Sequence, residues 1–355
     1  MVIALVLLFV MASSLSFIED RISERDKRIL YVILGIAMVL IAGLREVGST
    51  PDSEDYELMF YGKTNKVLEA ATEPSFAIIS SFLNSLSLGV NALFITYALI
   101  SVSIHLPAFW KISKYPFLTL TIYISYYYMM HDMVQIRCSI AAALFLWAIY
   151  FYAEEKKKQA LACVLAGIFF HYSATAGLLL FLTKHRISGW MTYALYLIVP
   201  LGLVAYFADF DISYLVPDEF GGAKLAVYRD LKDQGIEEQQ AGIRFEGNPV
   251  IWMNIILYYA CIYYKDYLTK YCKYVPVAIQ VQALAFACLF FIKGFSMVVG
   301  NRLNDYFSVA SIILWTASVY AFYPRLIGKI INNTVSAARF VASMLIYALS
   351  LIEMS

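Results

Sequence analysis

The chain has 355 residues, of which 61% are hydrophobic, and its mean hydropathy is +0.68. A soluble domain with one buried core does not reach these values, so the composition predicts a polytopic membrane protein. The net charge of +1 leaves no basic field that would attract nucleic acid, and we expect no such partner. The first eighteen residues lack the basic start and small-residue cleavage site of a removed signal, which favours a first spanning helix.

Apolar stretches that are long enough to cross a membrane, or nearly so, recur along the whole chain. The clear candidates are residues 2–18, 29–44, 90–110, 116–130, 138–153, 187–208, 249–264, 275–292, 303–323 and 335–352. Loops rich in Lys and Arg, such as 21–28, 154–158 and 265–273, mark the cytoplasmic side. The N-terminus is then expected on the outside.

The stretch 159–183 is either one ordinary span or two short helices that meet near His171. A single crossing would place the basic loop 265–273 outside, whereas two half-length crossings, 159–170 and 173–184, keep every basic loop inside. We therefore predict an all-α polytopic membrane protein with about twelve membrane segments, including this half-helix pair (159–184), and both termini outside.

One integral membrane domain is expected over 1–355, with two sizeable outside loops at 45–74 and 209–248. Long structured loops usually carry function. Within the second, 222–234 is predicted as a surface helix. The apolar stretch 74–87, with serines interleaved, is typical of a segment in the outer interface.

The richest polar cluster is GLREVGSTPDSEDY at 43–56, which leaves the second apolar segment. It contains Arg45, Asp52, Glu54, Asp55 and Tyr56. Gly48 and Pro51 bracket a turn that would fold the three acids back towards the arginine, which indicates a functional loop. An ordinary polar helix end would contain the same residue types.

Arg137 opens an apolar helix directly after a hairpin that carries His131 and Asp132. A charge at the mouth of a span costs a few kcal/mol if it faces lipid, so we expect the arginine to face protein or a water-filled cavity. Two structural readings stay open, namely snorkelling to outer phosphates and pairing with Asp132.

His171 lies where the two predicted half-helices turn at the outer face. A lone histidine in an apolar run is commonly a satisfied core residue, but broken helices often line binding cavities. Neutral near pH 7, its imidazole is able to accept a hydroxyl proton.

GNRLNDYFSVAS at 300–311 places Arg302, Asp305 and Tyr306 at the outer entrance of another helix. Arg302 and Tyr306 are four residues apart and share a face, so they are candidates to address one ligand while Asp305 fixes the helix end. A purely structural contact between Arg302 and Asp305 stays open. Walker A, GxGxxG, HExxH and GxSxG motifs are absent from the sequence, and we expect no metal and no cofactor.

The order of these clusters resembles the EpsG/Wzy-type family of bacterial surface-polysaccharide polymerases. The matching pieces are GLREVG…D…Y (43–56), QIRC…FFHYSA (135–174) and RLNDYF (302–307). The resemblance implies a GT-C-like glycosyltransferase of the bacterial inner membrane. It would join undecaprenyl-diphosphate-linked oligosaccharide repeats into O-antigen, capsule or exopolysaccharide on the periplasmic face. Its partners would be these lipid-linked oligosaccharides, the lipid bilayer, a flippase and a chain-length regulator.

That chemistry requires outward cations for the diphosphate and a base for the acceptor hydroxyl. We assign Arg137 and Arg302 to the diphosphate and Arg45 to positioning of the loop or substrate. His171 is the first candidate for the base, and an acid of the 52–55 group, Asp52 foremost, is the second. The remaining substrate-binding candidates are Glu54, Asp55, Tyr56, Asp132, Arg229, Arg244, Asp305 and Tyr306.

Two other classes of protein remain as alternatives. A lipid-linked oligosaccharide flippase would also need cations in a cavity, but it would carry charges along the middle of several helices and matching halves. A membrane polysaccharide O-acyltransferase would need a histidine that faces an acyl donor, for which the sequence offers His105, His131, His171 and His185. An O-acyltransferase function would not explain the outward arginines.

Overall fold

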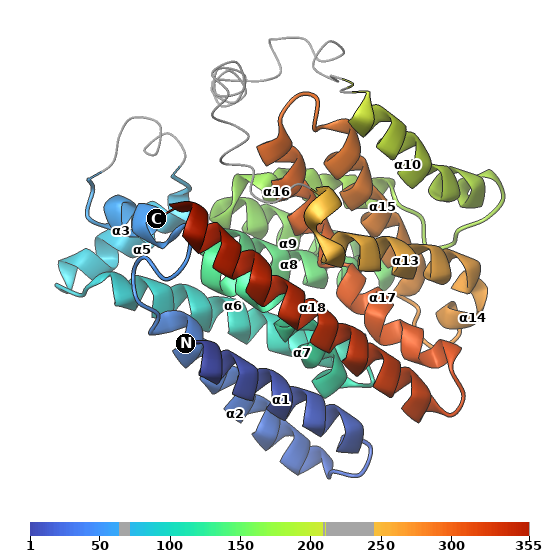
Figure 1. Cartoon of the computed structure of the whole chain (residues 1–355), viewed down its shortest axis with the longest axis horizontal. Coiled ribbons are helices and arrows are strands. Elements are labelled where there is room, and N and C mark those ends of the chain that lie inside the picture. The colour runs from blue at the N-terminus through green and yellow to red at the C-terminus, as the bar shows by residue number, and fades with distance from the viewer. Residues whose placement is uncertain (64–71, 209, 211–244, 355) are drawn as a thin grey trace.

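The structure is a computed structural model that describes residues 1–63, 72–208, 210 and 245–354, with side chains up to residue 348. Within these ranges the chain forms α-helices, shorter 3-10 and π-helical segments and turns, and no strand. The predicted all-α class is therefore confirmed. Figure 1 shows that the N-terminus, the C-terminus, α3 and α5 lie at the same end of the molecule.

The N-terminal half begins with the hairpin of α1 (Val2–Ile18) and α2 (Glu24–Gly43), and α2 starts where Ser23 accepts a hydrogen bond from the Asp26 amide. Mainly apolar runs account for the long helices among the elements that follow. These elements are α3 (Ser53–Phe60), α5 (Pro74–Ser85), α6 (Val90–Ile112), α7 (Pro116–Ile124), the π-helix η1 (Tyr128–Val134) and α8 (Ile136–Ala153). The apolar stretch predicted at 116–130 thus ends early, because the π-helix interrupts it.

The stretch after α8 is broken, as the charge pattern predicted. It consists of α9 (Lys157–Phe170) and the 3-10 helix η2 (Tyr172–Leu182), separated at His171, whose backbone is extended. The helices that follow are α10 (Trp190–Phe207), η5 (Phe245–Gly247), α13 (Pro249–Tyr263), α14 (Lys265–Thr269), α15 (Val275–Phe291), α16 (Met297–Ser308), α17 (Ser311–Ser318), η6 (Val319–Ala321) and α18 (Arg325–Met354).

Three described helices, α6, α8 and α10, are long and apolar enough to cross a membrane by themselves. Shorter apolar helices, among them α1, α13 and α15, accompany them. This pattern is consistent with a polytopic membrane protein, while the count of about twelve segments and the GT-C-like arrangement stay predictions.

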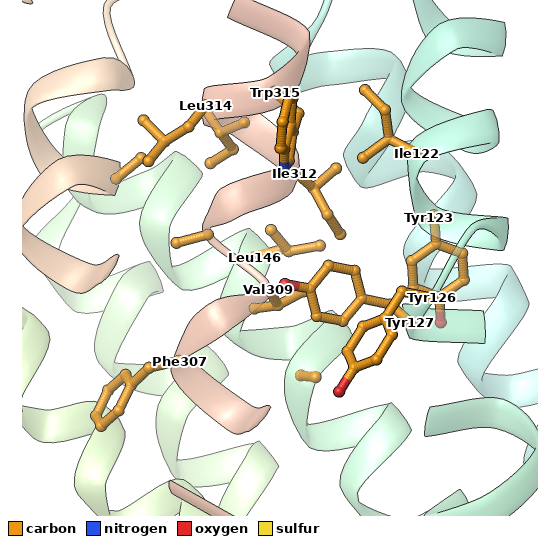
Figure 2. Packing of buried hydrophobic residues seen from close by; sticks show 14 of the residues in the cluster. Ile122, Tyr123, Tyr126, Tyr127, Leu146, Phe307, Val309, Ile312, Leu314 and Trp315 are labelled. Atoms are coloured by element: carbon orange, nitrogen blue, oxygen red, sulfur yellow. The ribbon is translucent and has the colours of Figure 1, made fainter. Parts of the chain in front are cut away.

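Two groups of buried apolar side chains hold the helices together. The larger one extends through α1, α7, α8, α13, α15 and α17, and Figure 2 shows a part of it that includes Tyr126, Tyr127 and Ile312. The smaller one includes Tyr56, Phe76 and Phe94, and joins α3, α5, α6 and the start of α8. It is this second cluster that positions the polar groups described below.

A buried ion cluster fixes the opposite end of the molecule. The Lys329 ammonium at the start of α18 lies 2.6 Å from Asp20 Oδ2 and 3.3 Å from Glu19 Oε1, at the turn between α1 and α2. Glu19 Oε2 accepts a hydrogen bond from the Phe117 amide at 3.0 Å and so caps α7. Burial raises the pKa of Glu19 to about 7, against the opposing charge of Lys329.

Candidate functional site

One buried carboxylate, Glu73, connects two of the residues singled out from the sequence. Its Oε1 lies 2.9 Å from His171 Nδ1, and its Oε2 accepts a hydrogen bond from Arg137 Nη1. Glu73 is only 2% exposed and precedes Pro74, which is the first residue of α5. The carboxylate therefore joins α5 to the first turn of α8 and to the connection between α9 and η2.

Aromatic rings enclose the guanidinium of Arg137. Its Cζ lies 5.4 Å from the ring centroid of Tyr56 and 5.5 Å from that of Phe76, and these two rings stack on each other. Cation–π contacts of this length favour a charged guanidinium next to apolar surface. The side chain of Arg137 retains 16% exposure, so it is held by protein while one edge stays accessible.

The break between α9 and η2 brings His171 to the carboxylate. The His171 amide ends α9 by donating to the Gly167 carbonyl at 2.9 Å, and the His171 carbonyl accepts from the Ala174 amide, which begins η2. Gly177 lets η2 approach α16, because a Cβ at this position would lie 2.6 Å from the Tyr306 hydroxyl. The broken stretch thus packs tightly on its neighbours and leaves its polar joint near α5.

The charge states of this pair follow from their surroundings. Burial disfavours the charged form of Glu73, but the hydrogen bond from His171 and the charge of Arg137 outweigh it and lower the pKa to about 2. His171 lies outside both helices, and burial lowers its pKa although Glu73 acts in the opposite direction. At pH 7 we expect a neutral imidazole that donates Nδ1–H to the carboxylate, which leaves the Nε2 lone pair available as a base.

The loop after α2 forms the turn that the sequence predicted. Gly48 has φ +78°, its amide donates to Ser53 Oγ at 2.9 Å, and Asp52 is the residue before α3. Glu54 and Asp55 are exposed on α3. Arg45 is 3% exposed, lies 3.9 Å over the Phe94 ring and donates to the Ala42 carbonyl. The cation of this loop is therefore buried against α6, and two of the acids face outward.

Three of the five arginines predicted for the site act on one carboxyl group. Burial raises the pKa of Asp52, and Arg302, Arg137 and Arg45 each oppose the shift. These cations come from the loop after α2, from the first turn of α8 and from α16. Arg302 is exposed on α16, and its charge also acts on His171.

Other predicted residues lie apart from this space. Asp132, proposed as a partner of Arg137, instead accepts hydrogen bonds from Tyr123 and Ser139 inside the bundle, so this structural reading is wrong. Tyr306 is fully buried and packs on Phe145 with ring centroids 4.7 Å apart. It therefore shares no exposed surface with Arg302. Asp305 is 8% exposed and buried in the same helix.

Arg229, Arg244 and the surface helix predicted at 222–234 lie outside the described residues. Among the residues that the structure does describe, no group of three His, Cys, Asp or Glu side chains has the arrangement of a metal site. Sequence reasoning missed Glu73. The available signal was a carboxylate directly before a proline that opens an apolar helix, a position where an acid is expected to stabilise the helix start.

Comparison with known proteins decides the family. A model of the EpsG family matches residues 28–355, which is nearly the whole chain. The chain belongs to the EpsG family. Neither the curated proteins nor the solved structures that were searched contain a match. Membership of the EpsG family indicates a polymerase-type function in polysaccharide synthesis, and the apolar helices agree with a membrane location.

Proposed function

We propose that this EpsG-family protein is a glycosyltransferase that joins lipid-diphosphate-linked oligosaccharide repeats into a surface polysaccharide, on the outer side of the bacterial inner membrane. The observation that carries the proposal is the contact of Glu73 with both His171 and Arg137. A carboxylate that orients a neutral histidine beside cations is the arrangement required to deprotonate a hydroxyl near an anionic leaving group.

The reaction divides among three side chains. The acceptor hydroxyl attacks the anomeric carbon of the donor sugar, a new C–O bond forms, and the bond from that carbon to the diphosphate oxygen breaks. His171 Nε2 takes the hydroxyl proton, and the lipid diphosphate leaves with the bonding electron pair. Arg302 and the accessible edge of Arg137 stabilise the charge on that leaving group.

Asp52 is the second candidate for the base. Burial raises the pKa of Asp52, and the side chain is partly exposed at the start of α3, where a substrate hydroxyl is able to reach it. His171 is preferred because it already has an orienting partner, whereas Asp52 is surrounded by cations that favour its charged form. Arg45, buried over Phe94, fixes the loop that carries Asp52 and acts on the substrate only through this loop.

The deciding experiment supplies purified lipid-linked repeats to the purified protein in nanodiscs, without nucleotide sugar or added metal. A ladder of products that differ by one repeat, absent from a His171→Ala sample of equal folded content, is the expected result. Translocation of the lipid across vesicles without lengthening would instead identify a flippase. Consumption of an acyl donor without lengthening would identify an acyltransferase.

A further inference from the structure

The largest fully buried side chain of the described structure is Arg339, in the middle of α18. It is 0% exposed, and within the described part of the chain Nε, Nη1 and Nη2 have no hydrogen-bond partner. No carboxylate is within ion-pair distance of it among the described residues. A buried cation without hydrogen bonds or a counterion lowers the stability of a fold, so a packing role alone does not explain this arginine.

Three aromatic rings surround the guanidinium. Its Cζ lies 5.6 Å from the centroids of Tyr127 and Trp315 and 6.0 Å from that of Tyr126. Figure 2 shows these rings on neighbouring elements of the bundle. The distances are at the outer limit of a cation–π contact, so the rings compensate only part of the cost of desolvation. The contacts with the guanidinium do hold Tyr126 and Tyr127 in a fixed position.

Tyr127 connects this cage to the elements of the candidate site. Its hydroxyl donates to the Ser308 carbonyl at 2.6 Å and lies 2.8 Å from Ser311 Oγ, at the junction of α16 and α17. Its ring stacks on His131 of the π-helix η1, with centroids 5.7 Å apart and planes at 8°. One side chain thus holds the end of the helix that carries Arg302 and the segment that leads into Arg137.

We propose that Arg339 is a positioning residue, which acts through Tyr127 to hold α16 and η1, and hence Arg302 and Arg137, at the spacing that a diphosphate requires. The proposal rests on the proposed glycosyl transfer for its effect on rate. π-Helical turns such as η1 often occur at functional sites. A misplacement of about 1 Å is sufficient to slow a reaction by about a hundredfold.

The test compares Arg339→Met with Arg339→Lys, and uses Leu345→Met on the exposed face of the same helix as a control. Methionine fills similar volume without charge. We therefore expect Arg339→Met to melt at the wild-type temperature or a few degrees higher. Hydrogen exchange of peptides covering 128–134 and 297–308 should accelerate, and kcat should fall about tenfold or more. The lysine variant keeps the cation and should retain most of the rate.

Two results would overturn the proposal. A lower melting temperature for Arg339→Met would show that the arginine is a structural element, and unchanged exchange in both peptides would show that it positions neither segment. If the wild-type protein made no ladder of products, the proposed glycosyl transfer would be refuted. The hydrogen-exchange and melting measurements would still test whether Arg339 positions the two segments.

Discussion

Replacing Glu73 with glutamine tests the centre of the site, because the amide keeps the shape of the carboxylate and removes its charge. The pKa of Glu73 is lowered from its ordinary 4.5 to about 2, and at 1.36 kcal/mol per pH unit this corresponds to about 3 kcal/mol in favour of the charged form. Loss of one partner of a buried ion pair typically costs about 3–5 kcal/mol. Since Arg137 keeps 16% exposure, we expect a loss at the low end of this range, about 3 kcal/mol.

The effect on rate should exceed the effect on stability. In the glutamine variant the amide oxygen is needed by Arg137, so the amide NH2 faces His171 Nδ1 and favours the tautomer that is protonated at Nε2. That tautomer has no lone pair on Nε2 to act as a base, and the rate should fall on the order of 10²–10³-fold. The assay measures the initial rate of ladder formation and the melting temperature in nanodiscs. Glu24→Gln, at an acid with 68% side-chain exposure, is the matched control and should change neither quantity.

A double-mutant cycle separates this mechanism from simple damage. If Glu73 acts through His171, then Glu73→Gln in a His171→Ala background should slow the reaction little further. Fully additive rate losses would refute the reasoning, as would a Glu73→Gln variant that melts and polymerises like the wild type.

Three further predictions concern other parts of the chain. Arg302→Ala should lower the rate by about a hundredfold with little change in melting temperature. The substitution also removes a cation that lowers the pKa of His171, so the acid limb of the pH–rate profile should move to higher pH. An acid limb at the wild-type pH would show that Arg302 does not act on His171. The pKa of Glu19 is raised to about 7 in the folded protein, so the folded state binds the Glu19 proton more tightly than the unfolded state does. The melting temperature should therefore fall as pH rises from about 5 to 7, and Glu19→Gln should abolish this slope. Phe82 is 62% exposed on α5, and a nitroxide attached to Phe82→Cys should collide with oxygen more often than with a water-soluble nickel reagent, as expected for a segment in the membrane interface. If the ratio of oxygen to nickel collisions were the same at Phe82→Cys and at the exposed Glu24→Cys, α5 would lie in water.

Hydropathy and charge predicted the helices well because each depends on local composition. The bounds 2–18 match α1, and the ends expected for α6, α8 and α13 lie within a few residues of those observed. The break at His171 was predicted from the charges of distant loops, since the stretch itself is uniformly apolar. The π-helix after α7 was not predicted, because it forms from an ordinary aromatic sequence that its tertiary contacts hold in place.

The centre of the site was beyond sequence reasoning for a physical reason. Glu73 lies 64 residues from Arg137 and 98 residues from His171, and nothing in the local pattern specifies which acid meets which cation. Tyr306 illustrates the reverse error. Its spacing from Arg302 placed both on one helical face, but the packing of η2 and Phe145 buries one part of that face.

The three arginines assigned to the diphosphate and the loop differ in their surroundings. Arg45 is buried over Phe94, Glu73 compensates Arg137, and Arg302 is exposed. Burial lowers the pKa of His171, and Arg137 and Arg302 lower it further against the effect of Glu73, so the free protein keeps its base neutral but weak. A diphosphate bound to these cations would cancel their effect on the imidazole, and the histidine would become a stronger base when both substrates are in place. Substrate binding would therefore activate the base that the bound substrate needs.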